Sequence, residues 1–127
     1  EASETVNVLH LHGTADDVIV YDGGWIFGSY YPSAWETVDL WAELNGCGPV
    51  ESQVIDTINM DNAVGGNETT IRAANDCEPN GSVELWSLEG SSHGPSMTNA
   101  GREAILQYML LHLIPCYVFF EMAVAHH

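Results

Sequence analysis

The chain has 127 residues, of which 46% are hydrophobic, and this is enough for one small domain with a buried core. Eighteen acidic residues face only two arginines, so the formal net charge at pH 7 is -16. Such a charge repels phosphate backbones and anionic lipid, which excludes nucleic acid as an expected partner.

The first predicted element is a buried strand at residues 6–12, an apolar and β-branched run that stops at Gly13. The residues before it include Glu1 and Glu4 and lack the basic and apolar regions of a signal peptide, so none is expected there. Residues 13–24 follow as a loop rich in Asp and Gly.

A helix is predicted at residues 33–45, where apolar side chains recur at near-helical spacing. Ser33 and Glu36 have the spacing of a capping box, and Gly46 is a stop signal. Its two tryptophans and one later in the chain are expected to lie in the core; they are Trp35, Trp41 and Trp86.

The second half of the chain continues the alternation of strand and helix. The expected segments are a polar loop at 59–68, a short edge strand at 69–74, a turn at 77–82, a main strand at 83–88, a Gly/Ser loop at 90–97 and a helix at 98–112. Strand, helix, strand and helix in this order predict parallel strands with crossover helices, which is the α/β class.

The last segment, residues 113–124, is apolar but is interrupted by Pro115 and is too short to span a bilayer. We therefore expect a domain at residues 1–112 and an apolar tail of unassigned role at 113–127. His126 and His127 at the end of the tail resemble the start of a purification tag.

Cys47, Cys77 and Cys116 are the three cysteines, and no CxxC motif indicates a zinc site. Cys47 and Cys77 each lie beside loop-like residues, which favours a disulfide between them in an oxidising compartment and leaves Cys116 free. The alternative is three reduced thiols. A disulfide would favour a secreted, extracellular or periplasmic location.

Reactive side chains concentrate in two loops that each follow a predicted strand, HGTADD at residues 12–17 and EGSSHG at 89–94. Because active groups of open α/β sheets gather at the carboxyl ends of the strands, we expect both loops in one site. Asp16 before His93 matches the acid-then-histidine order of α/β-hydrolases. In such a pair the carboxylate holds one imidazole nitrogen in its N–H form and stabilises the imidazolium.

Four segments of the chain resemble polyhydroxybutyrate depolymerases and related feruloyl and acetylxylan esterases. They are NVLHLHGTADDVIVYDGG, ETVDLWAELNGC, GGNETTIRAANDC and VELWSLEGSSHGPS, and the resemblance runs in register over residues 6–112. It implies a partial α/β-hydrolase fold, with the last parallel strands and crossover helices present. The amino-terminal half, which would carry the nucleophile and the oxyanion loop, is expected to be absent.

The same resemblance implies a function and assigns residues to it. The function is hydrolysis of a carboxylic ester through an acyl-enzyme, with Asp16 as the triad acid and His93 as the general base. It also implies that Cys47 pairs with Cys77. No cofactor or metal is predicted, and the expected partner is an ester substrate, bound once a nucleophile completes the site.

Two of these assignments have alternatives. Asp17 stands beside Asp16 and is the alternative acid. Ser92 is the alternative nucleophile, because residues 90–94 fit the letters GxSxG. Against Ser92, the acid would precede the serine, and neighbouring Ser92 and His93 side chains usually point apart. Beyond His93 only three histidines remain as a base, His112, His126 and His127.

Other readings of the function stay open as well. A non-catalytic truncated or interaction module is the main alternative to an esterase. A metal-dependent hydrolase is a distant third, based on zinc ligands at His10, His12, Asp16 and His93.

Two further expectations concern surfaces. Trp25, Tyr30 and Tyr31 lie near Asp16 in sequence and are candidates for an aromatic wall around an acyl or aryl group. With half a sheet missing, the strand at 6–12 is expected to leave an open apolar edge. That edge or the apolar tail would then pair copies into a homo-oligomer that strengthens with salt.

Overall fold

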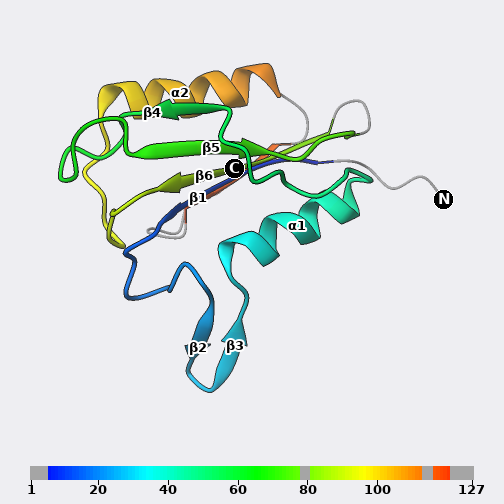
Figure 1. Ribbon diagram of the computed structural model, residues 1–127, viewed down its shortest axis with the longest axis horizontal. Coiled ribbons are helices and arrows are strands. Elements are labelled where there is room, and N and C mark those ends of the chain that lie inside the picture. The colour runs from blue at the N-terminus through cyan, green and yellow to red at the C-terminus, as the bar shows by residue number, and fades with distance from the viewer. Residues whose placement is uncertain (1–5, 78–80, 113–115, 121–127) are drawn as a thin grey trace.

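The computed structural model describes residues 6–77, 81–112 and 116–120. They form a five-stranded sheet with helices α1 (Ala34–Leu44) and α2 (Asn99–Leu111) on opposite faces, and a two-stranded hairpin that projects away (Figure 1). The strands of the sheet, in spatial order, are β4 (Asp56–Ile58), β5 (Thr69–Ala73), β6 (Ser82–Leu88), β1 (Asn7–Gly13) and β7 (Cys116–Phe120). The predicted mixture of strands and helices in one α/β unit is confirmed.

The sheet is mixed, and its parallel part holds the functional loops. β1 is parallel to both of its neighbours, β6 and β7, whereas β5 is antiparallel to β4 and β6. All seven residues of β1 are buried, as its continuous apolar run predicts for a strand covered on both faces. The strands predicted at 6–12 and 83–88 are both confirmed to within one residue.

Two apolar layers sandwich the sheet. On one face, Val38 and Ala42 of α1 pack with Val8 of β1 in one buried cluster. On the other face, Tyr108 of α2 packs in a second cluster that contains Leu9 of β1. Consecutive strand residues point to opposite faces, so β1 contributes to both clusters.

The predicted start of α1 is confirmed in detail. The Ser33 hydroxyl accepts from the Glu36 amide at 3.0 Å, and the Glu36 carboxylate accepts from the Ser33 amide at 2.8 Å, which completes the capping box. Of the tryptophans expected in the core, Trp86 is buried, whereas Trp35 and Trp41 are only partly buried.

Three parts of the fold differ from the prediction or were not foreseen. The strand predicted at 69–74 as an edge is β5, but it is not an edge, because β4 pairs with it on the outer side. The hairpin, formed by β2 (Gly24–Ile26) and β3 (Ser29–Tyr31), was not predicted, and neither were β4 and β7. Each of these missed strands has only three to five residues.

β7 corrects the expectation of an open apolar edge. It lies parallel to β1 on the side away from β6, and Val8, Leu9 and Leu11 of β1 are fully buried. Trp41 of α1 stacks on Phe119 of β7 at 6.0 Å between ring centroids. β1 is therefore not the open edge that was one of the two expected bases of the homo-oligomer, and in the described part of the chain the sheet ends at β7 on this side. Pro115, His126, His127 and most of the tail lie outside the described residues.

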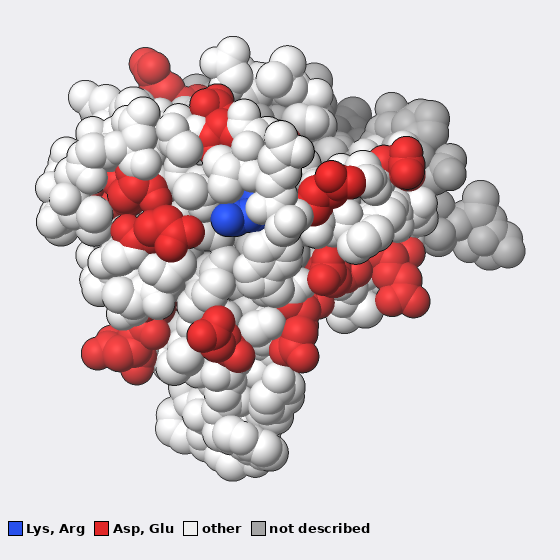
Figure 2. All heavy atoms as spheres, viewed as in Figure 1, with Lys and Arg blue, Asp and Glu red and all other residues white. Residues whose placement is uncertain are grey.

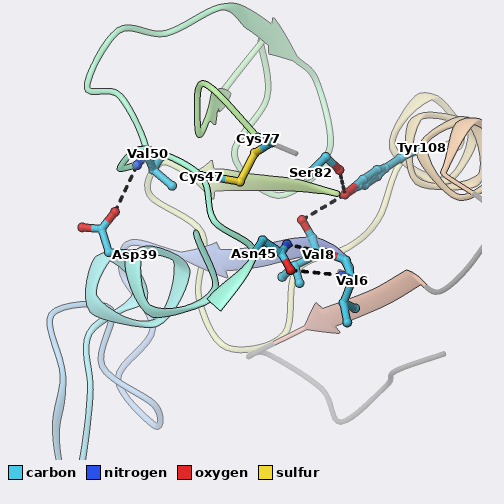
Figure 3. The surroundings of a disulfide bond; sticks show 9 residues. All are labelled: Val6, Val8, Asp39, Asn45, Cys47, Val50, Cys77, Ser82 and Tyr108. Atoms are coloured by element: carbon cyan, nitrogen blue, oxygen red, sulfur yellow. Dashed lines mark hydrogen bonds between the residues drawn. A yellow bond between two sulfur atoms is a disulfide. The ribbon is translucent and has the colours of Figure 1, made fainter. Parts of the chain in front are cut away.

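The Cys47–Cys77 disulfide is present and joins the segment after α1 to the segment after β5 (Figure 3). Beside it, Asn45 bonds both backbone polar groups of Val6, and this ties the end of α1 to the start of the sheet. Cys116 is a free thiol. The disulfide is consistent with an extracellular location. No helix among the described residues is long and apolar enough to cross a membrane.

Candidate functional site

The two loops that were expected to share a site do meet, at the carboxyl ends of β1 and β6. Gly13 ends β1 opposite Leu88 of β6, and the Thr14 amide donates to the Leu88 carbonyl at 3.0 Å. The Ala15 amide donates to the Ser91 carbonyl, also at 3.0 Å. A Cβ on Gly13 would lie 2.4 Å from that same carbonyl oxygen, so this close approach requires a glycine.

The carboxylate of Asp16 and the imidazole of His93 form a hydrogen-bonded pair across these loops. Nδ1 of His93 lies 3.1 and 3.0 Å from the two carboxylate oxygens. Because a carboxylate accepts, Nδ1 carries the proton, and in the neutral ring Nε2 carries the lone pair. The His93 side chain is 35% exposed, whereas that of Asp16 is fully buried. A buried acid behind an accessible imidazole is the arrangement that general-base chemistry requires.

Asp16 is held by its own turn as well as by His93. Its Oδ1 accepts from the backbone amides of Val18 and Ile19, both at 2.9 Å, so the carboxylate is fixed before any ligand binds. The neighbouring Asp17, considered as the alternative acid, is exposed, and the hydrogen bonds and ion pair of the His93 ring go to Asp16. The geometry thus brings Asp16, and not Asp17, to the histidine.

A second pair of histidines lies on β1 behind this turn. Nε2 of His12 is 2.7 Å from the Ile19 carbonyl, to which it donates, and 3.6 Å from Asp16 Oδ2, too far for a hydrogen bond. The unprotonated Nδ1 of His12 therefore faces Nε2 of His10, at 3.5 Å. Burial, with a smaller contribution from His12, lowers the pKa of His10 to about 3, so this ring is neutral.

These histidines do not assemble a metal centre with Asp16 and His93. Among the described residues, no three His, Cys, Asp or Glu side chains converge in a way that could hold a metal ion. The hydrogen bonds of His12 also oppose a shared metal ion. Its Nδ1 faces His10, and its Nε2 donates to the Ile19 carbonyl, so neither nitrogen is free to bind a metal together with Asp16 and His93.

Ser92 is exposed in the histidine loop, but no base lies against it among the described residues. Its hydroxyl accepts from the Gly94 amide at 3.3 Å. A nucleophile elbow is a strained turn, yet the non-glycine residues described with a positive φ are Phe27 and Asp76, not Ser92. His112 lies at the carboxyl end of α2, where its Nδ1 donates to the Tyr108 carbonyl at 2.9 Å, and no hydrogen bond joins it to Ser92. Two other candidate bases, His126 and His127, lie outside the described residues.

Asp61 supports the histidine loop, and its role was not evident in the sequence. The residue is 1% exposed; Oδ2 accepts from the Ser91 hydroxyl at 2.6 Å and Oδ1 from the Ser96 amide at 3.0 Å. Asp61 therefore holds the loop on both sides of His93. Burial alone would raise the pKa of Asp61, but these hydrogen bonds and one from the Ala63 amide outweigh it, so the pKa is lowered.

The three aromatic residues considered for a substrate wall separate in space. Trp25 and Tyr30 are exposed and pack edge to face on the hairpin, with ring centroids 5.6 Å apart. Tyr31 instead turns inward to a cavity beside His10 and His12.

Figure 2 shows acidic groups spread over the body of the molecule, while the projecting hairpin lobe carries no charged side chain on this face.

Comparison with known proteins identifies no relative. No protein-family model matches the chain, no curated protein is significantly similar to it, and no solved structure matches it.

Proposed function

We propose that this chain carries the acid and the general base of a serine-type carboxylic ester hydrolase. The observation that carries the proposal is the buried Asp16 carboxylate bonded to Nδ1 of the accessible His93, at the ends of two adjacent parallel strands. The sequence order of these two residues and the motifs around them support it.

In the proposed mechanism, Nε2 of His93 removes the proton from a nucleophilic hydroxyl as this attacks the ester carbonyl. His93 then returns the proton to the alcohol leaving group, and Asp16 stabilises the imidazolium throughout. In the second half-reaction His93 activates a water that hydrolyses the acyl-enzyme. The nucleophile and the oxyanion donors come from residues beyond those described here or from a second polypeptide.

The test measures hydrolysis of p-nitrophenyl acetate by the purified chain and by four variants. Without a serine nucleophile, we expect slow turnover that depends on His93 acting alone on this activated ester. The rate falls to the buffer rate in His93→Gln and is reduced in Asp16→Asn, whereas the matched variants Asp17→Asn and Ser92→Ala keep the rate of the unmodified chain. Equal rates for the unmodified chain and His93→Gln would overturn the proposal.

A fluorophosphonate probe decides where the nucleophile lies. We expect no labelling of the isolated chain, since the described residues place no base against Ser92. Labelling that disappears in both Ser92→Ala and His93→Gln would instead make the chain a self-contained serine hydrolase.

The hairpin favours a second candidate function, a non-catalytic binding module. Phe27 at its tip is 98% exposed and Trp25 is 72% exposed, which is unusual for large apolar side chains with no ligand to contact. If the chain is a binding module, it should adsorb to polyester particles, and the double variant Trp25→Ser/Phe27→Ser should no longer adsorb. Any hydrolysis of p-nitrophenyl acetate should then be the same in the unmodified chain and in His93→Gln.

A further inference from the structure

The loop that carries His93 is held from behind by a second loop, which joins β4 to β5 and contains two buried carboxylates. Because β5 runs antiparallel to β6, this second loop lies at the same end of the sheet as the histidine loop (Figure 1). Its carboxylates belong to Asp61, which is 1% exposed, and to Glu68, which is 8% exposed. Neither takes part in the proposed mechanism, so the mechanism does not account for their burial.

Asp61 is connected through Ser91 to both loops of the candidate site. Its Oδ2 accepts from the Ser91 hydroxyl at 2.6 Å, and its Oδ1 accepts from the Ser96 amide at 3.0 Å, beyond His93. Ser91 is fully buried, and its carbonyl accepts from the Ala15 amide of the acid loop at 3.0 Å. A displacement of Asp61 would therefore be felt by the acid loop as well as by the histidine loop.

Glu68 in turn holds Asp61. Its Oε1 accepts from the Asp61 amide at 3.1 Å, and its Oε2 accepts from the Met60 amide at 2.9 Å and from the Thr69 hydroxyl. Its backbone carbonyl accepts from the amide of Glu89, the first residue of the histidine loop, at 3.0 Å. Glu68 therefore fixes the backbone of Asp61 and also contacts the loop that Asp61 holds.

The contact between His93 and Asp16 depends on where this loop lies. Nδ1 of His93 is 3.1 and 3.0 Å from the two Asp16 oxygens, and a displacement of about 1 Å would break this hydrogen bond. The His93 side chain is 35% exposed, so packing supports the ring on one side only. The backbone of the loop must supply the rest of the precision.

We propose that Asp61 and Glu68 are positioning residues of the candidate site. Glu68 fixes Asp61, and Asp61 holds the histidine loop so that Nδ1 of His93 stays on Asp16. The effect on activity rests on the proposed hydrolase function, whereas the effect on the geometry of the pair can be measured without any substrate.

The two carboxylates are expected to tolerate different replacements. In Asp61→Asn the amide oxygen can take the place of Oδ1, and the NH2 group can donate to the Ser91 hydroxyl, which both donates and accepts. In Glu68→Gln the NH2 group would face a backbone N–H, that of Asp61 in one orientation and that of Met60 in the other. Both substitutions remove one negative charge, so this asymmetry separates a role in geometry from a role of charge.

The test follows the Nδ1 proton of His93 by NMR at neutral pH, in the unmodified chain and in variants. A proton held between an imidazole and a carboxylate resonates far downfield, and exchange with water removes the signal when the bond opens. The resonance is assigned by its loss in His93→Gln. We expect it to persist in Asp61→Asn and to be lost in Asp61→Ala, Ser91→Ala and Glu68→Gln. Val38→Ala is the control, because it weakens the core under α1 on the other face of the sheet, and it should keep the resonance.

The same variants are compared in the His93-dependent hydrolysis of p-nitrophenyl acetate. We expect rates within about twofold of the unmodified chain in Asp61→Asn and Val38→Ala, and a fall of about tenfold or more in Asp61→Ala and Glu68→Gln, because a small displacement of a catalytic group is costly. If Asp61→Ala does not fold, Ser91→Ala and Glu68→Gln decide the matter.

Three results of the NMR measurement would overturn the proposal. They are absence of the resonance from the unmodified chain, its persistence in Ser91→Ala and Glu68→Gln, and its loss in Asp61→Asn or Val38→Ala. A chain that shows no His93-dependent hydrolysis but follows the expected NMR pattern would contradict the hydrolase function and still support the positioning of the pair.

Discussion

Nδ1 of His93 lies 3.0 Å from Oδ2 of Asp16, although 77 residues separate them in the chain. Their contact depends on the register of β1 against β6, which sets Gly13 opposite Leu88 and so brings the two following loops together. The pair is therefore a product of backbone packing at the strand ends, and that packing can be tested separately from the pair itself.

Gly13→Ala should separate the loops. A Cβ at this position would lie 2.4 Å from the Ser91 carbonyl oxygen and 2.8 Å from that of Ser92, and neither is a side chain that could rotate away. We expect a loss of about 1–3 kcal/mol in the free energy of unfolding, measured by denaturant titration. Gly94→Ala, in the histidine loop, is the matched control, because a Cβ there meets no atom within 4 Å. Equal stability of the two variants would contradict the close approach.

Asp16→Ala should destabilise the chain, whereas Asp17→Ala should not. The buried Asp16 carboxylate accepts from the amides of Val18 and Ile19 as well as from His93, and its removal leaves these donors without a partner. The expected cost is about 1–3 kcal/mol, against less than about 0.5 kcal/mol for the exposed Asp17. Thermal unfolding of both variants measures the difference. A larger loss of stability in Asp17→Ala would indicate that Asp17, and not Asp16, is the carboxylate held in this turn.

The parts of the fold that the sequence predicts well are those with a strong local pattern. The buried run at β1 and the capping box of Ser33 and Glu36 each depend on neighbouring residues, and both were found as expected. The Asp16–His93 contact also followed from general rules, because the carboxyl ends of neighbouring parallel strands lie at one edge.

The parts that were missed depend on contacts distant in sequence. β7 is formed from an apolar tail whose pattern fits several structures, and it becomes a strand by pairing with β1. Asp61 looks like an ordinary loop residue until the fold buries it against Ser91 and Ser96. The contacts of His10 with His12 and of His12 with the Ile19 carbonyl likewise appear only once the turn after Asp16 is placed against β1.

Asp61 should stabilise the chain in a pH-dependent way. Its pKa is lowered below the ordinary value of 3.8, so the folded state keeps this carboxylate charged to a lower pH than the unfolded state does. Its contribution is therefore complete above pH 3.8 and is lost as the pH falls through the folded-state pKa. We expect Asp61→Asn to be less stable than the unmodified chain at pH 6 and the difference to shrink below pH 3.8. A difference that grows as the pH falls would contradict this account.

His10 should make the chain less stable in mild acid. Its pKa is about 3 in the folded state and 6.5 as a free side chain, so between these values the unfolded state binds a proton that the folded state does not. Stability falls as the pH drops below 6.5, with a slope from this residue of at most about 1.4 kcal/mol per pH unit. The measurement is urea unfolding from pH 7 to 5, where His10→Leu should give a shallower dependence. Parallel curves for the two proteins would show that His10 is not held neutral by burial.

Val118→Pro should expose the edge of β1 that the sequence had predicted to be open. Val118 is fully buried in the cluster below α2 and pairs with Leu9 in the parallel ladder between β7 and β1. Proline lacks the amide hydrogen and is poorly tolerated within a ladder, so β7 should detach. The N–H and C=O groups along one side of β1 would then be unpaired. They would lie next to apolar side chains that are buried in the unmodified chain, and such an edge is a template for pairing with another chain. The net charge of -16 opposes that association, and salt screens it, so the apparent mass should increase with ionic strength.

Val118→Ala is the control for this experiment, because it removes most of the side chain and keeps the backbone hydrogen bonds of β7. Light scattering at low and high salt, at tens of micromolar protein, compares the two variants with the unmodified chain. We expect association that grows with salt in Val118→Pro and a smaller response in Val118→Ala, in which β7 still covers β1. If both variants associate equally, lost core packing and not the open strand edge drives the assembly. If neither does, pairing with β7 is not what keeps β1 from pairing with another copy of the chain.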